Sequence, residues 1–507
     1  MTLIRKDMSY RVLHNRLNGR LTAGVVCGAL THRDGSFSYD DAKPQEGSNH
    51  WSPTEYNRNN ARNVNFANGN ANNNNKYNGN VVRPVAAFGD IVPVSFLCSV
   101  WEAYEDCLKG KMTSIQAIEY MSIADRDIPC LAWELWTGCY KPGTSTCFLV
   151  RYPKWREVFA ACFRDRIVHH WICLRLEPLF EERFVALGNV SFNCRKGFGT
   201  DKAVEHVAEA MRCVSYNYHL PAWVFRGDLV GFFMSIDKDL LWYLLERFIK
   251  RWRKRYEREG WAKVSSEILE RLGMDGMPEM YWDILLRTVR TVVMHHPERD
   301  CILNSPTSWW ENLASNKSLF TSPTGAPIGN LTTQQFANFL MSFLVAFIIF
   351  LYRRKNFDEA QFVDDFAIVR DDLKFIVRSI PKIESFLKEK LKLTLHADKR
   401  YLQPVSHGVL FTGSFIRPGR LYLSNRTLGR MSEKCEGFRK MLEDGCNLIE
   451  LQRIEQVLNS YLGFCRRRRT YRFRKQLIDG MGSGFWHYFN IRGHYESVRL
   501  KKKYRLI

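Results

Sequence analysis

The sequence lacks several features that would place it in a familiar class. None of its 14 cysteines stands in a CxxC pair, so neither a zinc ribbon nor a disulfide framework is indicated. The N-terminus carries no signal-peptide pattern. The most apolar stretch, Phe339 to Tyr352, has about 14 residues, fewer than the roughly 20 that span a bilayer. We therefore expect a cytoplasmic protein with reduced thiols, no membrane partner and a buried helix at this stretch.

Acidic residues are scarce relative to basic ones. The 53 Asp and Glu residues face 74 Lys and Arg residues, which gives a formal net charge of +21. Such an excess favours a polyanionic partner, with nucleic acid as the first candidate. Cys465 to Lys475 (CRRRRTYRFRK) interleaves cations with Tyr471 and Phe473, a pattern suited to phosphates and stacked bases. The residues expected to bind nucleic acid here are Arg466, Arg467, Arg468, Arg469, Arg472 and Arg474.

Hydrophobic residues are sparse near the N-terminus. From Asn49 to Asn80, 14 of 32 residues are Asn, and such a composition cannot build a core. We expect residues 1–90 to be a disordered, low-complexity segment. From about Val92 onward the composition becomes ordinary and apolar residues recur at helical spacing, as from Ser95 to Lys109.

The most informative stretch is Gln361 to Val369, QFVDDFAIV. Two short apolar runs flank two adjacent acids, which predicts a β-hairpin with Asp364 and Asp365 in its turn. Asp tolerates the left-handed backbone that such a turn requires. Neighbouring carboxylates repel each other unless a cation lies between them, and hard oxygen ligands favour Mg²⁺ or Mn²⁺. Taken alone, the motif fits a solvated acidic turn equally well.

A third carboxylate is offered by FRGDLVGFFMSIDKDLLW, Phe225 to Trp242. Asp228 ends a short apolar run, and Phe233 follows five residues later. Asp237 is the weaker ligand candidate because it stands where it could cap the following helix.

Three further stretches carry candidate residues. Arg195 and Lys196 precede two glycines and a helix, an arrangement that suits a triphosphate, although a basic Gly turn is usually only a turn. A Pro/Gly loop containing Ile328 and Gly329 leads into the long apolar helix, and Lys399 stands before a series of expected strands.

The order of these motifs resembles the right-hand polymerase fold of reverse transcriptases over roughly Val92 to Ile478. Within that family, FRDRIVHH, SFNCRKGFGT, GFFMSIDKDLLW, NKSLFTSPTGAPIGNLTTQ, FVDD and NSYLGF are most similar to the diversity-generating retroelement branch. The resemblance implies an α+β fold with fingers, palm and thumb. It divides the chain into the Asn-rich segment 1–90, an N-terminal and fingers region 91–220, a palm with inserted fingers helices 221–415, and a basic helical thumb and tail 416–507.

The resemblance also implies roles for individual residues. Asp228, Asp364 and Asp365 would hold two Mg²⁺ ions, with Mn²⁺ as a substitute, and Lys399 would give a proton to pyrophosphate. Arg195 and Lys196 would grip the dNTP, and the Phe233 ring would exclude a ribose 2′-hydroxyl. Ile328, Gly329 and Gln334 would lie near the nascent base pair, where most reverse transcriptases carry Gln in place of Ile328. In the retroelement branch this substitution accompanies error-prone copying.

The implied function is RNA-directed DNA synthesis, error-prone at template adenines, that diversifies a target gene. The implied partners are template RNA, a cDNA or primer, dNTPs and a small basic accessory protein. Trp51 to Phe88 resembles the variable segment of C-type-lectin-like target proteins, so it is expected to be translated template repeat; a disordered RNA-holding arm is the alternative. Rival functions are a reverse transcriptase of retron, phage-defence or group II intron type, and a non-catalytic RNA-binding scaffold.

Overall fold

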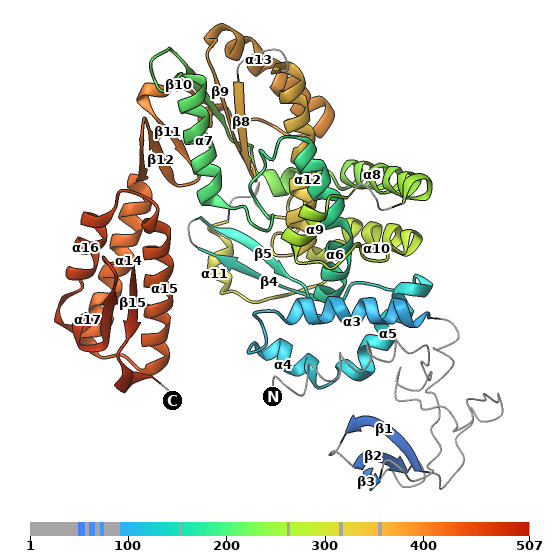
Figure 1. Ribbon diagram of the computed structural model, residues 1–507. Helices are drawn as coiled ribbons and strands as arrows, with labels where there is room; N and C mark the ends of the chain where they lie inside the picture. Colours follow the sequence, from blue (N-terminus) through green and yellow to red (C-terminus); the bar gives the residue numbers. More distant parts are fainter. Residues whose placement is uncertain are drawn as a thin grey trace.

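The computed structural model describes residues 92–151, 154–260, 264–313, 318–352 and 357–505, and the backbone of three strands nearer the N-terminus (Figure 1). These strands are β1 (Asn49–Glu55), β2 (Asn60–Asn65) and β3 (Ala71–Asn75), and they pair in that order as an antiparallel sheet. The rest of residues 1–91 lies outside the described residues. Disorder and a translated template repeat in this segment therefore stay predictions.

The central feature is a four-stranded antiparallel sheet with the order β10-β6-β9-β8. Its strands are β6 (Trp223–Gly227), β8 (Phe357–Phe362), β9 (Asp365–Arg370) and β10 (Tyr401–Pro404). Helix α7 (Thr200–Val214) covers one face, where it packs on Val224, Ala367 and Val369. The other face carries Phe225, Phe366 and Ile368 into the main hydrophobic core. Since β9 is buried on both faces, its sequence is a continuous apolar run.

The main core is built by long helices. They include α3 (Val94–Leu108), α6 (Phe163–Ala186), α8 (Lys238–Glu259), α10 (Trp282–Met294), α12 (Leu331–Tyr352) and α13 (Leu373–Phe386). Helix α12 contains the predicted apolar stretch and, by length and composition, could cross a membrane. However, 67% of its most apolar window is buried inside the protein, so α12 is the core helix expected from the sequence.

Further helices and two small sheets complete the fold. The helices are α4 (Ile115–Met121), α5 (Ala124–Thr137), α9 (Ser266–Leu272) and α11 (Thr307–Trp310). A three-stranded sheet joins β4 (Ser145–Val150), β5 (Arg156–Ala160) and β7 (Cys301–Leu303). A second joins β11 (Val409–Phe411), β12 (Ser414–Arg417) and β13 (Arg420–Leu423), which confirms the strands expected after Lys399.

The C-terminal unit has its own hydrophobic core. It contains α14 (Asn425–Asp444), α15 (Leu448–Arg466), α16 (Tyr471–Asp479), α17 (Gly482–Tyr488) and a hairpin of β14 (Phe489–Arg492) and β15 (Ser497–Leu500). The helices agree with the expected helical end of the chain, whereas the closing hairpin was not predicted. The α+β class is confirmed, and the domain boundaries stay predictions.

Candidate active site

The predicted acidic hairpin is present. Phe362 pairs with Asp365 across β8 and β9, so Val363 and Asp364 form a two-residue turn. The left-handed backbone lies at Val363, with φ of 58°, and not at an Asp as expected. A β-branched residue rarely adopts this conformation, because its Cβ substituents crowd the backbone. The turn that carries Asp364 is therefore strained and must be held by its surroundings.

Asp228 comes to this hairpin because it directly follows β6. Gly227 pairs with Phe366, which places Asp228 beside Asp365 at the same end of the sheet. A Cβ atom at Gly227 would lie 2.6 Å from the Phe366 ring, so only glycine allows the two strands this approach. The structure thus brings together the three carboxylates that the sequence singled out.

The electrostatics of the three carboxylates differ. Burial and the neighbouring Asp365 and Asp228 carboxylates raise the pKa of Asp364 to about 7. Burial also raises the pKa of Asp365. The positive charge of the Arg226 guanidinium acts in the opposite direction and lowers it. Arg226 Nη2 donates to Asp365 Oδ1 at 2.8 Å. Sequence reasoning missed Arg226; its position two residues before Asp228, on the same face of a strand, was the available signal.

Lys399 also reaches the cluster, where its ammonium group forms an ion pair with Asp228. The backbone explains how it arrives. The Val230 amide donates to the Thr394 carbonyl at 2.9 Å, and the His396 amide donates to the Asp228 carbonyl at 2.8 Å. The chain before Lys399 therefore runs alongside the segment after Asp228, and the resemblance-based placement of Lys399 at the site agrees with this geometry.

The donor chemistry at this end of the sheet fits a hard divalent cation. Three carboxylates supply oxygen ligands, and burial together with the two neighbouring carboxylates raises the pKa of Asp364, which a cation between them would oppose. Among the described residues, no three Asp, Glu, His or Cys side chains are gathered as a ready metal cage. Asp228 and Asp365 are turned toward Lys399 and Arg226 instead. Lys399 and Arg226 thus supply positive charge beside two of the three carboxylates.

The Arg195 side chain is not available to bind a phosphate. Its side chain is 0% exposed and its Nε atom donates to Glu181 Oε1 at 2.8 Å. Other guanidinium hydrogens go to the Ser191 carbonyl and to Asn189 Oδ1. The expectation that Arg195 grips a triphosphate is therefore corrected: this cation already has its anion and supports the loop.

Lys196 remains accessible, with a side chain 48% exposed. Its Nζ atom donates to the Leu272 carbonyl at 2.7 Å and lies 3.7 Å from Glu177. A phosphate role for Lys196 stays a prediction.

Phe233 and the Pro/Gly loop lie against each other. The Ala326 amide donates to the Phe233 carbonyl at 2.8 Å. Ile328 packs on the small apolar cluster around Phe159 and Met234. Gly329 has φ of 126°, and a Cβ atom there would lie 2.4 Å from the Phe159 carbonyl oxygen. The glycine is therefore required for the close approach of this loop to β5.

Gln334 is exposed in the first turn of α12, where its Oε1 atom lies 3.6 Å from Cys194 Sγ. No contact in the structure tests its expected place near a base pair, so this role stays a prediction.

The predicted arginines of the C-terminal unit divide into two groups. Arg468 is buried between Ser414, the Phe464 ring and Asp201 of α7. Arg474 is also buried, with Nη1 donating to the Tyr495 carbonyl at 2.8 Å. These two serve the fold, which corrects their assignment to nucleic acid. The exposed members are Arg466, Arg467, Arg469 and Arg472.

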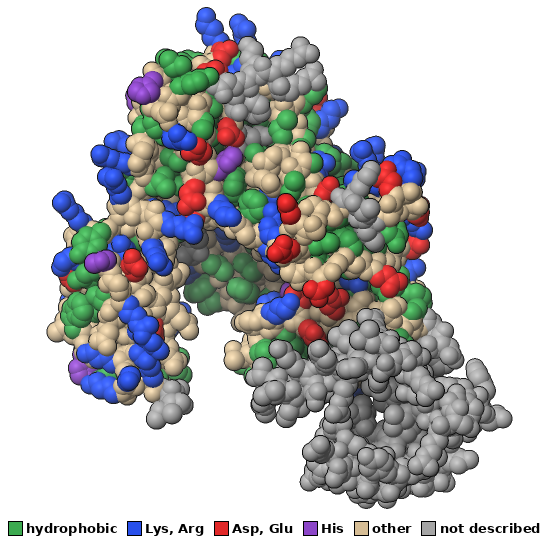
Figure 2. Space-filling view, in the orientation of Figure 1, with side chains coloured by type: hydrophobic (Ala, Val, Ile, Leu, Met, Phe, Trp, Pro, Cys, Tyr) green, Lys and Arg blue, Asp and Glu red, His purple; other side chains and the backbone are tan. Residues whose placement is uncertain are grey.

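The exposed arginines belong to the C-terminal unit, and a hollow in the surface lies between the lower part of this unit and the rest of the molecule (Figure 2). Arg467 reaches across to α7, where it lies 3.4 Å from Glu205 and 3.7 Å from Asp201. Since these pairs are exposed, they are weak and leave the guanidinium available to phosphate.

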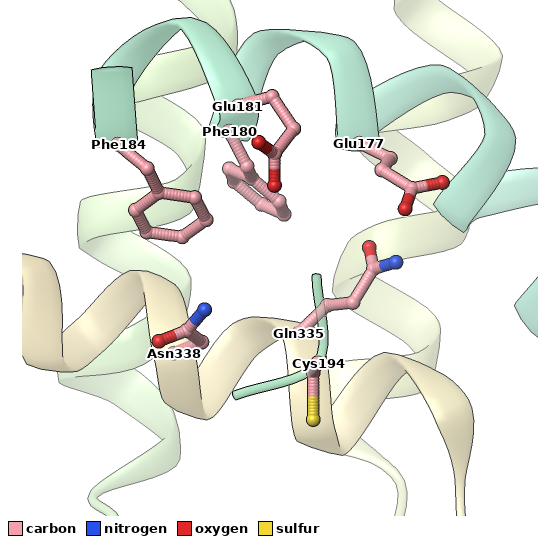
Figure 3. Close-up of a pocket in the computed structure, with 7 residues that line it drawn as sticks. All are labelled: Glu177, Phe180, Glu181, Phe184, Cys194, Gln335 and Asn338. Atoms are coloured by element: carbon pink, nitrogen blue, oxygen red, sulfur yellow. The ribbon is translucent and has the colours of Figure 1, made fainter. Parts of the chain in front are cut away.

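A small pocket lies elsewhere, between α6 and α12 (Figure 3). Its cavity volume is about 10 Å³. Its lining residues are Glu177, Phe180, Glu181, Phe184, Cys194, Gln335 and Asn338. None of the three clustered aspartates lines it, so it is not the site of the carboxylate chemistry.

Comparison with known proteins gives little beyond the geometry. No protein-family model and no curated protein matches the chain. Among solved structures, apo telomerase from Candida tropicalis aligns at 12% identity and a TM-score of 0.38, over 68% of this chain and 63% of that one. Telomerase from Candida albicans, in complex with a TWJ fragment of telomeric RNA, aligns at 13% identity and a TM-score of 0.38, over 68% and 59%. The chain thus spans less than two thirds of these structures, and at such values the likeness does not indicate an activity.

Proposed function

We propose that this chain is an RNA-directed DNA polymerase. The observation that carries the proposal is the meeting of Asp228, Asp364 and Asp365 at one end of a four-stranded antiparallel sheet, with Lys399 beside them. The motif order resembles reverse transcriptases in the same residues. A scaffold without chemistry would gain nothing from three clustered carboxylates, one of which has its pKa raised to about 7 by burial and by its two neighbours.

In the proposed reaction Asp228 and Asp364 would hold two Mg²⁺ ions, with Asp365 beside them. Bound Mg²⁺ would lower the pKa of the primer 3′-hydroxyl and neutralise the charge on the leaving pyrophosphate. Lys399, which pairs with Asp228, would give its ammonium proton to that pyrophosphate. Arg226 would orient the Asp365 carboxylate and oppose the rise in its pKa.

The remaining parts of the proposal concern substrate. Template RNA and primer bind the C-terminal unit through its exposed arginines, and a dNTP enters beside Phe233. We further propose adenine-directed errors at Ile328, whose apolar side chain cannot hydrogen-bond near the template base, and a small basic accessory protein. A reverse transcriptase of retron, phage-defence or group II intron type remains the alternative to this retroelement role. A neighbouring gene that ends in a near-copy of residues 51–88, altered mainly at template adenines, would favour the retroelement.

The decisive experiment is primer extension on an RNA template with four dNTPs and Mg²⁺. Wild type should extend the primer, and extension should stop with a chelator. Asp364→Asn removes a ligand charge with little change in shape and should abolish extension. Asp444→Asn makes the same change at the exposed end of α14 and should leave extension intact. Extension by the Asp364→Asn protein at the wild-type rate would overturn the assignment.

A further inference from the structure

A pair of buried amide side chains lies beneath the strained turn. Asn193 and Gln361 are only 4% and 1% exposed. The Val363 amide donates to Asn193 Oδ1 at 3.0 Å, and Gln361 Nε2 donates to the Val363 carbonyl at 2.7 Å. Both backbone polar groups of Val363 are therefore held by side chains. Gln361 Nε2 also reaches Asn193 Oδ1, at 3.3 Å, which joins the two amides to each other.

The loop that carries Asn193 is itself fixed on several sides. The Phe192 amide donates to the Gln361 carbonyl at 3.0 Å, and the Gln361 amide donates to the Val190 carbonyl at 2.8 Å. Asn338 Nδ2 of α12 donates to the Asn193 carbonyl at 3.0 Å. Asn193 therefore cannot drift away from the turn without breaking hydrogen bonds to β8 and to α12.

Arg195 also holds the loop that carries Asn193. Its Nη1 atom donates to the Ser191 carbonyl at 2.6 Å, and its other nitrogens hold the buried Glu181 carboxylate of α6. A buried ion pair of this kind is costly to break, because removing one partner leaves the other charge unpaired. The cation predicted to hold substrate thus anchors the loop beneath the catalytic turn.

The two amide side chains stabilise the strained backbone conformation of Val363. A two-residue hairpin turn favours positive φ at its first position, but a β-branched residue adopts this conformation only at a cost. The side-chain hydrogen bonds to the Val363 N–H and C=O stabilise it against a return to negative φ. That return would rotate the following peptide and swing Asp364 away from Asp228. Because the conformation occurs beside the clustered carboxylates, its maintenance bears directly on where the Asp364 oxygens point.

We propose that Asn193 and Gln361 form a clamp that holds Val363 in its left-handed conformation and so positions the Asp364 carboxylate for the reaction. They are positioning residues, since they act through Val363 and do not touch substrate. The inference rests on the proposed polymerase function for its kinetic consequence. Whether Asn193 and Gln361 hold the Val363 backbone does not depend on the enzymatic function and can be tested without an activity assay.

The first test is hydrogen–deuterium exchange, without metal, at the Val363 amide. In the wild type this amide should exchange slowly, because its hydrogen bond to Asn193 is buried. Asn193→Ala should speed its exchange while amides in the middle of β9 stay protected. Gln361→Met keeps the volume of the side chain but removes the donor to the Val363 carbonyl, and should also loosen the turn. Gln403→Ala, which removes a half-buried amide from β10 of the same sheet, should leave it unchanged.

The second test is kinetic. Asn193→Ala and Gln361→Met should lower kcat for primer extension by tenfold or more, up to about 100-fold, because small misplacements of reacting groups cost that much. The apparent KM for dNTP should change little. Adding Val363→Gly to Asn193→Ala should recover part of kcat, since glycine adopts positive φ without help. A residue that only stabilised the fold would not be rescued by a glycine in a turn.

The outcomes separate the two ideas. Unchanged exchange at Val363 in both variants overturns the clamp. Faster exchange with unchanged kcat, or a folded Asn193→Ala protein that Val363→Gly does not rescue, overturns the positioning role. A wild type that never extends a primer overturns the proposed function, while the exchange result still decides whether the clamp exists.

Discussion

Replacing Asp364 by Asn should stabilise the metal-free protein above pH 7 while removing its activity. The Asp364 pKa rises from the usual 3.8 to about 7 in the folded chain. The folded state therefore binds a proton more tightly than the unfolded state does. Binding of this proton contributes its full amount to the free energy of unfolding below about pH 4. That contribution is lost as the pH rises to about 7. Asn carries no charge, so the variant escapes this loss.

The size of the effect follows from the shift. About three pH units at 1.4 kcal/mol each correspond to an upper bound of about 4 kcal/mol. Asp364 is partly exposed, and its titration is linked to that of Asp228 and Asp365. Solvent screening and this linkage both make the stability change smaller than the upper bound. We expect the variant to gain about 2 kcal/mol at pH 8.

The assay is unfolding by heat or urea in the presence of a chelator at pH 5 and at pH 8. The gain of Asp364→Asn over wild type should be larger at pH 8 than at pH 5, and Asp444→Asn should show no such gain. Added Mg²⁺ should stabilise the wild type more than the variant and narrow the difference, because a ligand that binds the folded state stabilises it. A variant no more stable than wild type at pH 8, or a difference that Mg²⁺ leaves unchanged, would refute the reasoning.

Three other predictions concern substrate. Phe233→Ala should admit ribonucleotides and lower the dNTP-over-rNTP ratio of kcat/KM by about tenfold or more; an unchanged ratio would remove Phe233 from the site. Ile328→Gln should lower errors opposite template adenine, and equal error spectra from sequenced products would contradict this. Neutralising Arg466, Arg467, Arg469 and Arg472 together should weaken RNA binding across sequences and reduce the salt slope by about 0.7 for each phosphate that the protein no longer neutralises. Arg468→Ala should instead lower stability, and an unchanged salt slope in the fourfold variant would mark the exposed arginines as a solvated surface.

The sequence predicted the parts of the site that local patterns control. Two apolar runs around adjacent acids indicated the hairpin of β8 and β9, because alternation and turn chemistry act within a few residues. The apolar stretch after Ile328 indicated the buried helix α12. In each case the neighbours that determine the conformation are close in the chain.

The same patterns could not say which cations meet which anions. Arg195 and Lys196 are adjacent and look alike in the sequence, yet one is fully buried against Glu181 and the other is half-exposed. The six arginines of the C-terminal stretch also look alike, yet Arg468 and Arg474 are buried. Partners of this kind lie on other elements, so their choice depends on how helices and strands pack.

By itself, then, the sequence determined the elements and the chemistry available to them: an acidic hairpin, a third carboxylate after an apolar run, a core helix and an excess of positive charge. Only the tertiary structure decided that Val363 takes the strained place in the turn, that Asn193 and Gln361 hold it, and that Arg226 and Lys399 face Asp365 and Asp228. The physical reason is the distance along the chain over which each kind of interaction acts. Propensity and periodicity act along the chain, whereas hydrogen bonds and ion pairs form between residues that packing brings together.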